Sequence, residues 1–202
     1  MTAHPPHPPA TQTVTQMALA DRLTRVSSSQ TQQVLTAAEG LRRQGVDVID
    51  LGAGEPDFAT PPHVKAAGTA AIAADFTKYT PNAGIAELKE AICARYLDDY
   101  GTRYTPAETI VTAGGKQALF NVAMSLFGPG DEVITHAPAW PSIVEQIKIA
   151  GAEPVLVRTY PDEGFRVAAA RVLDALSART RAIIINSPGN PTGISSSAIR
   201  FT

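Results

Sequence analysis

The stretch Thr109-Ile110-Val111-Thr112-Ala113-Gly114-Gly115-Lys116 decides the fold. Its first four residues are β-branched and predict a short strand, after which the glycine pair leads into a helix expected over Lys116–Phe127. The alternation continues downstream, with strands predicted at Glu132–Thr135, Val155–Val157 and Ala182–Ile185 and helices at Pro141–Gly151 and Val167–Leu176. Short continuous apolar strands separated by helices indicate parallel strands covered on both faces, so we predict an α/β layer fold from about residue 105.

The residues upstream of this stretch predict mainly helices. Apolar residues recur at helical spacing over Val34–Leu41 and Ile85–Tyr96. Pro62–Asp75 is predicted as a helix because it is alanine-rich and has no interior breaker except Gly68. Cys93 lies beside the apolar stripe of the last helix and is interpreted as a packed thiol rather than a nucleophile. One short strand is expected at Val48–Leu51, before a glycine-rich turn.

Net charge and the counts of cysteine and histidine argue against several classes of function. Among 202 residues, 17 Lys and Arg against 19 Asp and Glu give a net charge of −2, which leaves no basic surplus for nucleic acid or an anionic membrane. The single cysteine, Cys93, fits a reducing compartment, and we expect a cytoplasmic protein. His4 and His7 lie in a proline-rich start with no third ligand nearby, so no metal site is predicted there.

Three loops follow predicted strands, where ligands bind in open α/β sheets. They are Ala113–Lys116, His136–Trp140 and Asn186–Gly193. In the first loop, glycines and a helix start suit a phosphate, although a structural turn explains the same residues equally well. The spacings of a dinucleotide fingerprint and of a nucleotide P-loop are both absent.

The other two loops favour an aromatic ligand. Trp140 either packs in the core or stacks on a planar ring, and an asparagine such as Asn190 can donate a hydrogen bond to a ring oxygen. Together the three loops describe a small, phosphorylated, aromatic ligand.

Asn186-Ser187-Pro188-Gly189-Asn190-Pro191-Thr192-Gly193 resembles the N-x-P-x-N-P-T-G signature of class I aminotransferases, the fold-type-I enzymes that use pyridoxal 5′-phosphate. Four further motifs resemble landmarks of that family, especially of its bacterial aspartate aminotransferase branch: Leu51–Phe58, Thr77–Tyr79, Gly84–Leu88 and Gly114–Leu119. The resemblance covers the chain from about Leu35 to Gly193.

The resemblance implies a role for five residues at the cofactor. The backbone amides of Gly115 and Lys116 would hold the phosphate. Trp140 would stack on the pyridine ring, and Asn190 would hydrogen-bond its 3′ oxygen. Tyr79 would reach the phosphate of the partner subunit, so the site would need a homodimer. The bonds Ala137–Pro138 and Asn190–Pro191 are expected to be cis.

The resemblance also implies the substrates, an amino acid and a 2-oxo acid. Gly54 would lie against the α-carboxylate of the substrate, beside Trp140 and Asn190. Lys116 would help to bind the distal carboxylate of aspartate or another dicarboxylate, with a general electrostatic aid to the phosphate as the alternative.

No catalytic residue is assigned, because the family's Schiff-base lysine lies downstream of the N-P-T-G loop, as do its pyridinium-binding carboxylate and its substrate-binding arginine. Only Lys116 belongs to a site motif, and it lies at the phosphate end; the other lysines are Lys65, Lys78, Lys89 and Lys148. The residues from Ile194 onward also depart from the polar helix start expected there.

We therefore expect the N-terminal part of the PLP-transferase fold, truncated: a helical N-terminal segment, then an α/β/α sheet of mostly parallel strands. Residues 1–30 are expected to form a flexible arm, 31–60 the N-terminal segment of the small domain, and 61–202 an incomplete PLP-binding large domain. Three functions stay open: a transaminase whose chain alone is inactive, a C–S/β-lyase of the same fold, and a non-catalytic binding module.

Overall fold

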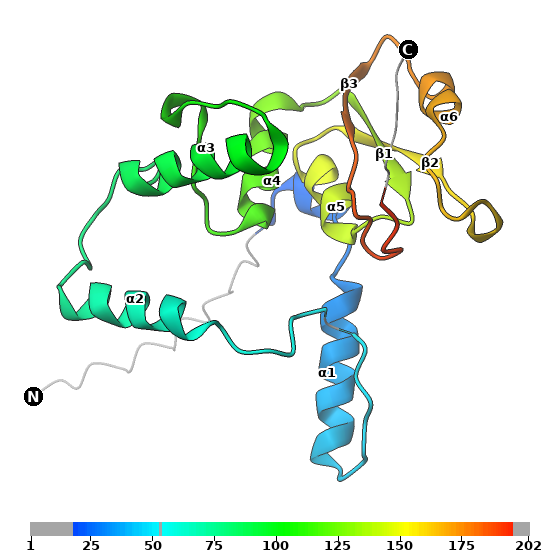
Figure 1. The fold of residues 1–202 in the computed structure, drawn as a ribbon. Helices are drawn as coiled ribbons and strands as arrows, with labels where there is room; N and C mark the ends of the chain where they lie inside the picture. Colours follow the sequence, from blue (N-terminus) through cyan, green and yellow to red (C-terminus); the bar gives the residue numbers. More distant parts are fainter. Residues whose placement is uncertain (1–17, 53, 196–202) are drawn as a thin grey trace, which may run out of the picture.

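Three parallel strands form the sheet around which the chain is organised (Figure 1). The structure is a computed structural model that describes residues 18–52 and 54–195. The strands are β1 (Glu132–Ala137), β2 (Glu153–Arg158) and β3 (Thr180–Ile184), in the order β2-β1-β3. Ile134 of the central strand pairs with Val155 on one side and Ile183 on the other.

Helices cover both faces of this sheet. The α-helices are α1 (Gln30–Arg43), α2 (Pro62–Ala73), α3 (Ala86–Tyr100), α4 (Gly115–Leu126), α5 (Pro141–Ile149) and α6 (Ala169–Asp174). Val133 packs in a core cluster with residues of α4 and α5, whereas its neighbour Ile134 packs with Val172 of α6. Since successive side chains of a strand point to opposite faces, α4 and α5 cover one face and α6 the other. The predicted α/β fold is confirmed.

Short 3-10 helices occur at Asp21–Arg25 (η1), Pro106–Glu108 (η2) and Pro161–Glu163 (η3). The first of them fastens the start of the described chain to the sheet. The Arg25 guanidinium donates to the carbonyls of Gly151 (2.7 Å) and Ala152 (3.2 Å), in the turn before β2. The Ser27 N–H donates to the Glu145 carboxylate of α5 at 2.8 Å. The part of the expected N-terminal arm that precedes residue 18 lies outside the described residues.

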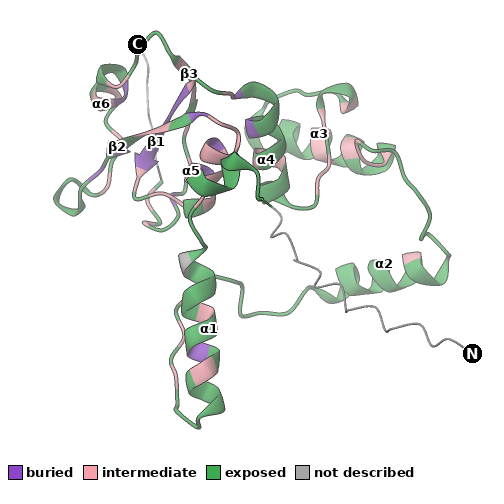
Figure 2. Ribbon diagram, turned by 180° about the vertical axis from the view of Figure 1, so that it is seen from behind, coloured by how far each residue is buried: buried purple, intermediate pink, exposed green. Residues whose placement is uncertain are grey.

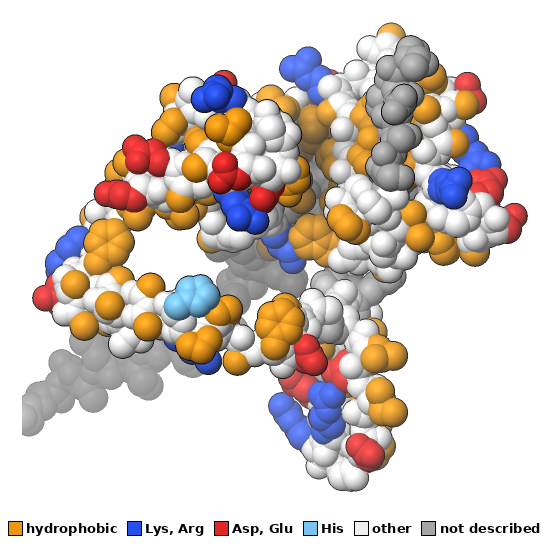
Figure 3. Space-filling model, viewed as in Figure 1, with side chains coloured by type: hydrophobic (Ala, Val, Ile, Leu, Met, Phe, Trp, Pro, Cys, Tyr) orange, Lys and Arg blue, Asp and Glu red, His pale blue; other side chains and the backbone are white. Residues whose placement is uncertain are grey.

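The helical region outside the sheet is open. α1 extends away from the sheet, and α2 lies apart from it with no buried residue (Figures 1 and 2). Hydrophobic side chains are exposed along α2 and α3 (Figure 3). Within the described residues, no helix combines the length and the apolar character that crossing a membrane requires.

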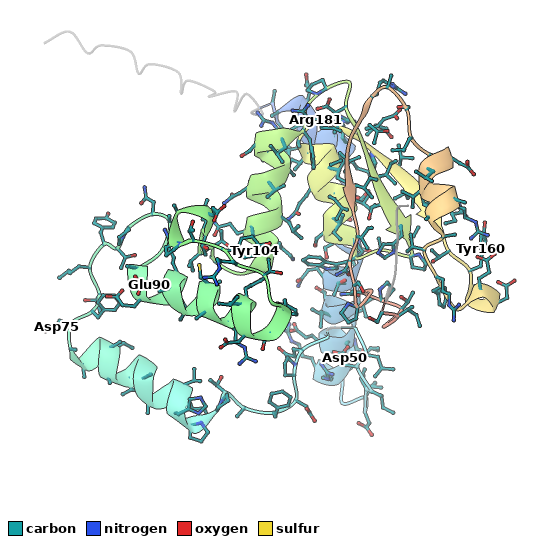
Figure 4. All side chains as sticks on the ribbon, turned by 45° about the horizontal axis from the view of Figure 1, so that its top comes forward. Asp50, Asp75, Glu90, Tyr104, Tyr160 and Arg181 are labelled. Carbon is teal, nitrogen blue, oxygen red and sulfur yellow. The ribbon has the colours of Figure 1, made fainter. Side chains whose placement is uncertain are left out.

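Two predicted strands are wrong. Val48–Leu51 is not a strand; the segment returns along α1, where the Asp50 carboxylate lies 3.2 Å from Arg42 (Figure 4). Thr109–Thr112 is not a strand either; Val111 donates its N–H to Ala83 at 3.0 Å and packs against Gly84. A strand needs a neighbouring strand to accept its ladder hydrogen bonds, and neither segment has one among the described residues.

Candidate functional site

The N-terminus of α4 is formed by Gly114, Gly115 and Lys116, whose backbone we call the cradle. Gly114 precedes the helix with φ +80° and ψ 166°, a conformation that only glycine adopts readily. Nothing lies within 4 Å of the position that a Cβ would take at Gly114 or Gly115. The first N–H groups of a helix have no intrahelical acceptor, so Gly115 and Lys116 present free donors at the positive end of the helix dipole.

Local hydrogen bonds set the direction of this helix start. The Thr112 hydroxyl donates to the Gly114 carbonyl at 2.9 Å, and the Ala113 N–H donates to Gln117 Oε1 at 2.6 Å. From α5, Gln146 Nε2 donates to the Lys116 carbonyl at 2.9 Å. The first turn of α4 is therefore held by its own loop and by the neighbouring helix.

Trp140 lies directly beside the cradle. It occupies the N-cap position of α5 and is half-buried against the core cluster of α4 and α5. The Lys116 ammonium lies 5.2 Å from the centroid of the Trp140 ring, within the range of a cation–π interaction. Among the described residues Lys116 has no carboxylate partner, so the ammonium and the helix dipole together favour an anion here.

The loop after β3 carries Asn190 to the same edge of the sheet. The Asn190 N–H donates to Asn186 Oδ1 at 3.0 Å, and Asn190 itself is exposed. Asn186 in turn donates its N–H to His136 Nε2 at 3.4 Å. Because β1 and β3 are parallel neighbours, their carboxyl ends bring Trp140 and Asn190 into adjacent loops. The bonds Ala137–Pro138 and Asn190–Pro191 are cis, as predicted, and Ser187–Pro188 is cis as well.

Gly54 and Tyr79 are not brought to this cradle by direct contacts. Both lie outside the sheet layer, Gly54 before α2 and Tyr79 between α2 and α3, and both are exposed. In residues 18–52 and 54–195, no hydrogen bond or ion pair joins either residue to Gly115, Lys116 or Trp140. Tyr79 is fully exposed. The roles expected of these two residues stay predictions.

Two residues of the site were given no role of their own by the sequence analysis. Gln146 holds the start of α4, and His136 joins the loops after β1 and β3. A titratable ring at the end of the mainly apolar stretch Val133–Ala137, which also contains Thr135, is the signal for His136. Gln146 lies on a helix without any comparable signal. Within the described ranges, no three His, Cys, Asp or Glu side chains form a group that could hold a metal ion.

Comparison with known proteins gives a consistent result. Residues 46–198 match the family model described as "Aminotransferase class I and II". The probable aspartate/prephenate aminotransferase of Thermus aquaticus is 51% identical over 176 residues, which cover 87% of this chain and 46% of the relative. The aspartate/prephenate aminotransferase of Thermus thermophilus is 50% identical over 175 residues, with the same coverage.

Solved structures give the same assignment. The structure of the aspartate aminotransferase from Thermus thermophilus with maleate superimposes with a TM-score of 0.84 at 48% identity, covering 87% of this chain and 46% of that chain. The fold is therefore that of the corresponding part of these enzymes. The chain spans about half the length of the curated relatives that it matches.

Proposed function

Because the chain belongs to the aminotransferase class I and II family, we propose that it forms the phosphate- and ring-binding side of a pyridoxal 5′-phosphate site for amino-group transfer. The reaction passes an amino group between an amino acid and a 2-oxo acid. The observation that carries this proposal is the open start of α4 at Gly114 and Gly115, where the Lys116 ammonium lies over the ring of the half-buried Trp140.

The residues present fit such a cofactor. A phosphate needs several donors that converge without steric obstruction. The first-turn amides of Gly115 and Lys116 have no intrahelical acceptor, and no atom lies within 4 Å of the position that a Cβ would take at Gly114 or Gly115. An aromatic ring needs a flat apolar neighbour, which Trp140 supplies. A ring oxygen needs a donor, which the Asn190 side-chain amide supplies.

When bound, the cofactor supplies an electron-withdrawing ring that stabilises negative charge at the α-carbon of the amino acid. The residues of this chain then bind and orient. Gly115 and Lys116 hold the phosphate, Trp140 fixes the plane of the ring, and Asn190 keeps the ring oxygen anionic by donating to it. Gly54 is proposed to admit the α-carboxylate of the substrate.

Aspartate or another dicarboxylate is proposed as the preferred amino acid. The Lys116 ammonium has no carboxylate partner among the described residues, so it is free to pair with a second carboxylate of the substrate. The Thermus relatives are named aspartate/prephenate aminotransferases, which supports a dicarboxylic substrate over an uncharged one and amino transfer over β-elimination.

We further propose that none of the five lysines of this sequence is the Schiff-base lysine, so that these 202 residues alone do not turn over substrate. Lys116 lies in the first turn of α4, which is proposed to hold the phosphate, with its ammonium over the Trp140 ring. Borohydride reduction of the chain with pyridoxal 5′-phosphate is therefore expected to label no single lysine stoichiometrically. One lysine fully labelled, as identified by mass spectrometry, contradicts this.

A homodimer is proposed as the assembly in which Tyr79 reaches the phosphate of the partner subunit. The full exposure of Tyr79 among the described residues supports this role, because it leaves the side chain accessible to a partner subunit. The single cysteine supports a reducing, cytoplasmic setting.

A chimera tests the proposed function. The matched residues of this chain replace the corresponding part of the Thermus thermophilus enzyme, to which they are 50% identical. We expect amino transfer from aspartate to a 2-oxo acid. Asn190→Ala is expected to lower kcat/KM by about tenfold or more, whereas the matched control Asn82→Ala, at an exposed loop position, leaves it unchanged.

The outcomes separate the candidate functions. A folded chimera that releases ammonia and a 2-oxo acid without any acceptor is a lyase, not a transaminase. A folded chimera that binds pyridoxal 5′-phosphate but accepts no amino acid contradicts both and supports a binding module.

A further inference from the structure

His136 is a buried histidine with both ring nitrogens engaged. It is 6% exposed and lies near the carboxyl end of β1, the central strand. Alternation along β1 places it on the face of Ile134, whose cluster contains the apolar residues Val157 and Val172. A polar ring in such surroundings is stable only when its nitrogens have hydrogen-bond partners.

The two partners of the ring fix its tautomer. Nδ1 lies 3.1 Å from the carbonyl oxygen of Pro138, which can only accept, so Nδ1 carries the proton. Nε2 faces the N–H of Asn186 at 3.4 Å, which can only donate, so Nε2 is unprotonated. Only the neutral ring with its proton on Nδ1 satisfies both partners.

These bonds connect the two loops that carry the proposed ring contacts. Pro138 lies two residues before Trp140, and Asn186 accepts the Asn190 N–H on its side-chain oxygen. A continuous path therefore runs from the Pro138 carbonyl through the imidazole and Asn186 to the Asn190 backbone. On its other flank, the loop after β1 is held by Thr159, whose N–H and hydroxyl both donate to the Ala137 carbonyl at 2.8 and 2.9 Å.

We propose that His136 is a positioning residue: in its Nδ1–H form it ties the loop of Trp140 to the loop of Asn190 and so fixes the separation of the two sides of the ring pocket. The two hydrogen bonds of His136, which we call the tie, are a property of this chain. Their consequence for pyridoxal 5′-phosphate rests on the proposed function.

The tautomer is measured in the unchanged chain. Long-range proton–nitrogen NMR of the ¹⁵N-labelled 202-residue chain is expected to show one histidine ring with a protonated Nδ1 and an unprotonated Nε2, and His136→Gln removes that signal. A ring at position 136 with its proton on Nε2, or one exchanging between the two forms, overturns the proposal. The tautomer is read from the unchanged chain, and the His136→Gln variant serves only to assign the signal.

Two substitutions separate hydrogen bonding from packing. His136→Leu keeps a side chain of similar bulk without polar atoms, whereas His136→Gln retains a donor and an acceptor. We expect the Asn186 and Asn190 amides to exchange about fivefold faster with solvent in His136→Leu, as the loss of one hydrogen bond implies. His136→Gln is expected to restore most of the protection, and the control His63→Leu, at an exposed position on α2, leaves both rates unchanged. Equal exchange in the Leu variant and the unchanged chain overturns the proposal.

Cofactor binding is read separately through Trp140, the only tryptophan. Quenching of its fluorescence by pyridoxal 5′-phosphate is expected to need several-fold more cofactor in His136→Leu and to recover in His136→Gln. If the tautomer and the exchange rates are as expected but no cofactor quenches Trp140, the tie stands and the proposed function fails. If the cofactor binds equally well to all variants, the proposed function stands and the positioning role fails.

Discussion

Replacing Gly114 by alanine tests the backbone conformation of the cradle alone, because the added Cβ meets no neighbouring atom. Gly114 has φ +80° and ψ 166°, in a region where a residue with a Cβ costs about 1–3 kcal/mol. Nothing lies within 4 Å of the new Cβ, so the entire cost comes from the backbone. For a domain of this size, that lowers the melting temperature by about 2–4 °C for each kcal/mol.

Gly115→Ala is the matched control. Gly115 is the first residue of α4 and has no positive φ, and the space around its Cβ is equally open. Alanine there gains up to about 1 kcal/mol of helix propensity, so this variant is expected to be as stable as the unchanged chain or more so.

The two variants are compared by urea unfolding, followed through Trp140 fluorescence and circular dichroism. The midpoint is expected to fall for Gly114→Ala and to stay or rise for Gly115→Ala. Titration with inorganic phosphate is expected to be weaker for Gly114→Ala, because the amides of the first turn are reoriented. Equal midpoints, or greater damage at Gly115, would refute the assignment of the strain to Gly114.

Three further outcomes are expected. In the chimera, Lys116→Ala lowers kcat/KM for aspartate by about 10- to 100-fold and much less for alanine; equal losses support a role at the phosphate alone. Hydrogen bonds from the Arg171 guanidinium at 2.5 and 2.6 Å hold the pKa of Glu163 below its ordinary value of 4.5. The stability that this ion pair adds to the fold is therefore complete above pH 4.5 and is lost as the pH falls through the lowered pKa. Arg171→Ala raises the NMR titration midpoint of Glu163 toward 4.5, and an unmoved midpoint contradicts the pairing. The 202-residue chain binds a hydrophobic dye, because side chains such as Ile183 and Ile185 are 38% and 37% exposed at the carboxyl end of β3; a dye-negative chain with one sharp melting transition shows that these surfaces are covered.

The sequence predicted those elements whose signals are local. Pro141 at the first position of α5 and Gly151 after its end mark that helix in the sequence, and continuous apolar runs mark β1 and β3. Thr109–Thr112 has the composition of a strand, but a strand also depends on a hydrogen-bonded neighbour. The actual partner of Val111 is the Ala83 carbonyl of a distant loop, which no local pattern indicates.

The candidate site also has parts that the sequence predicted and parts that only the structure revealed. The glycine pair, Trp140 and the asparagine loop were predicted because each is a short motif after a strand. The approach of Lys116 to Trp140 and the bonds of His136 join residues from different elements. They depend on how α4 packs on α5 and on which strand lies beside β1, so they became visible only in the structure.

The central place of β1 in the order β2-β1-β3 also bears on the sequence of events by which the chain folds. β1 and β2 are joined through α5 alone, whereas β3 pairs with β1 across a longer connection and Arg25 meets Gly151 across 126 residues. Closing longer loops costs more chain entropy, so the β1–α5–β2 unit is expected to form first, β3 to dock next and the N-terminal segment to fasten last. During synthesis from the N-terminus, the loop of Trp140 is therefore expected to form before the loop of Asn190. The hydrogen bond from the Asn186 N–H to His136 is then expected to form when β3 docks, and it joins the loop of Trp140 to the loop of Asn190.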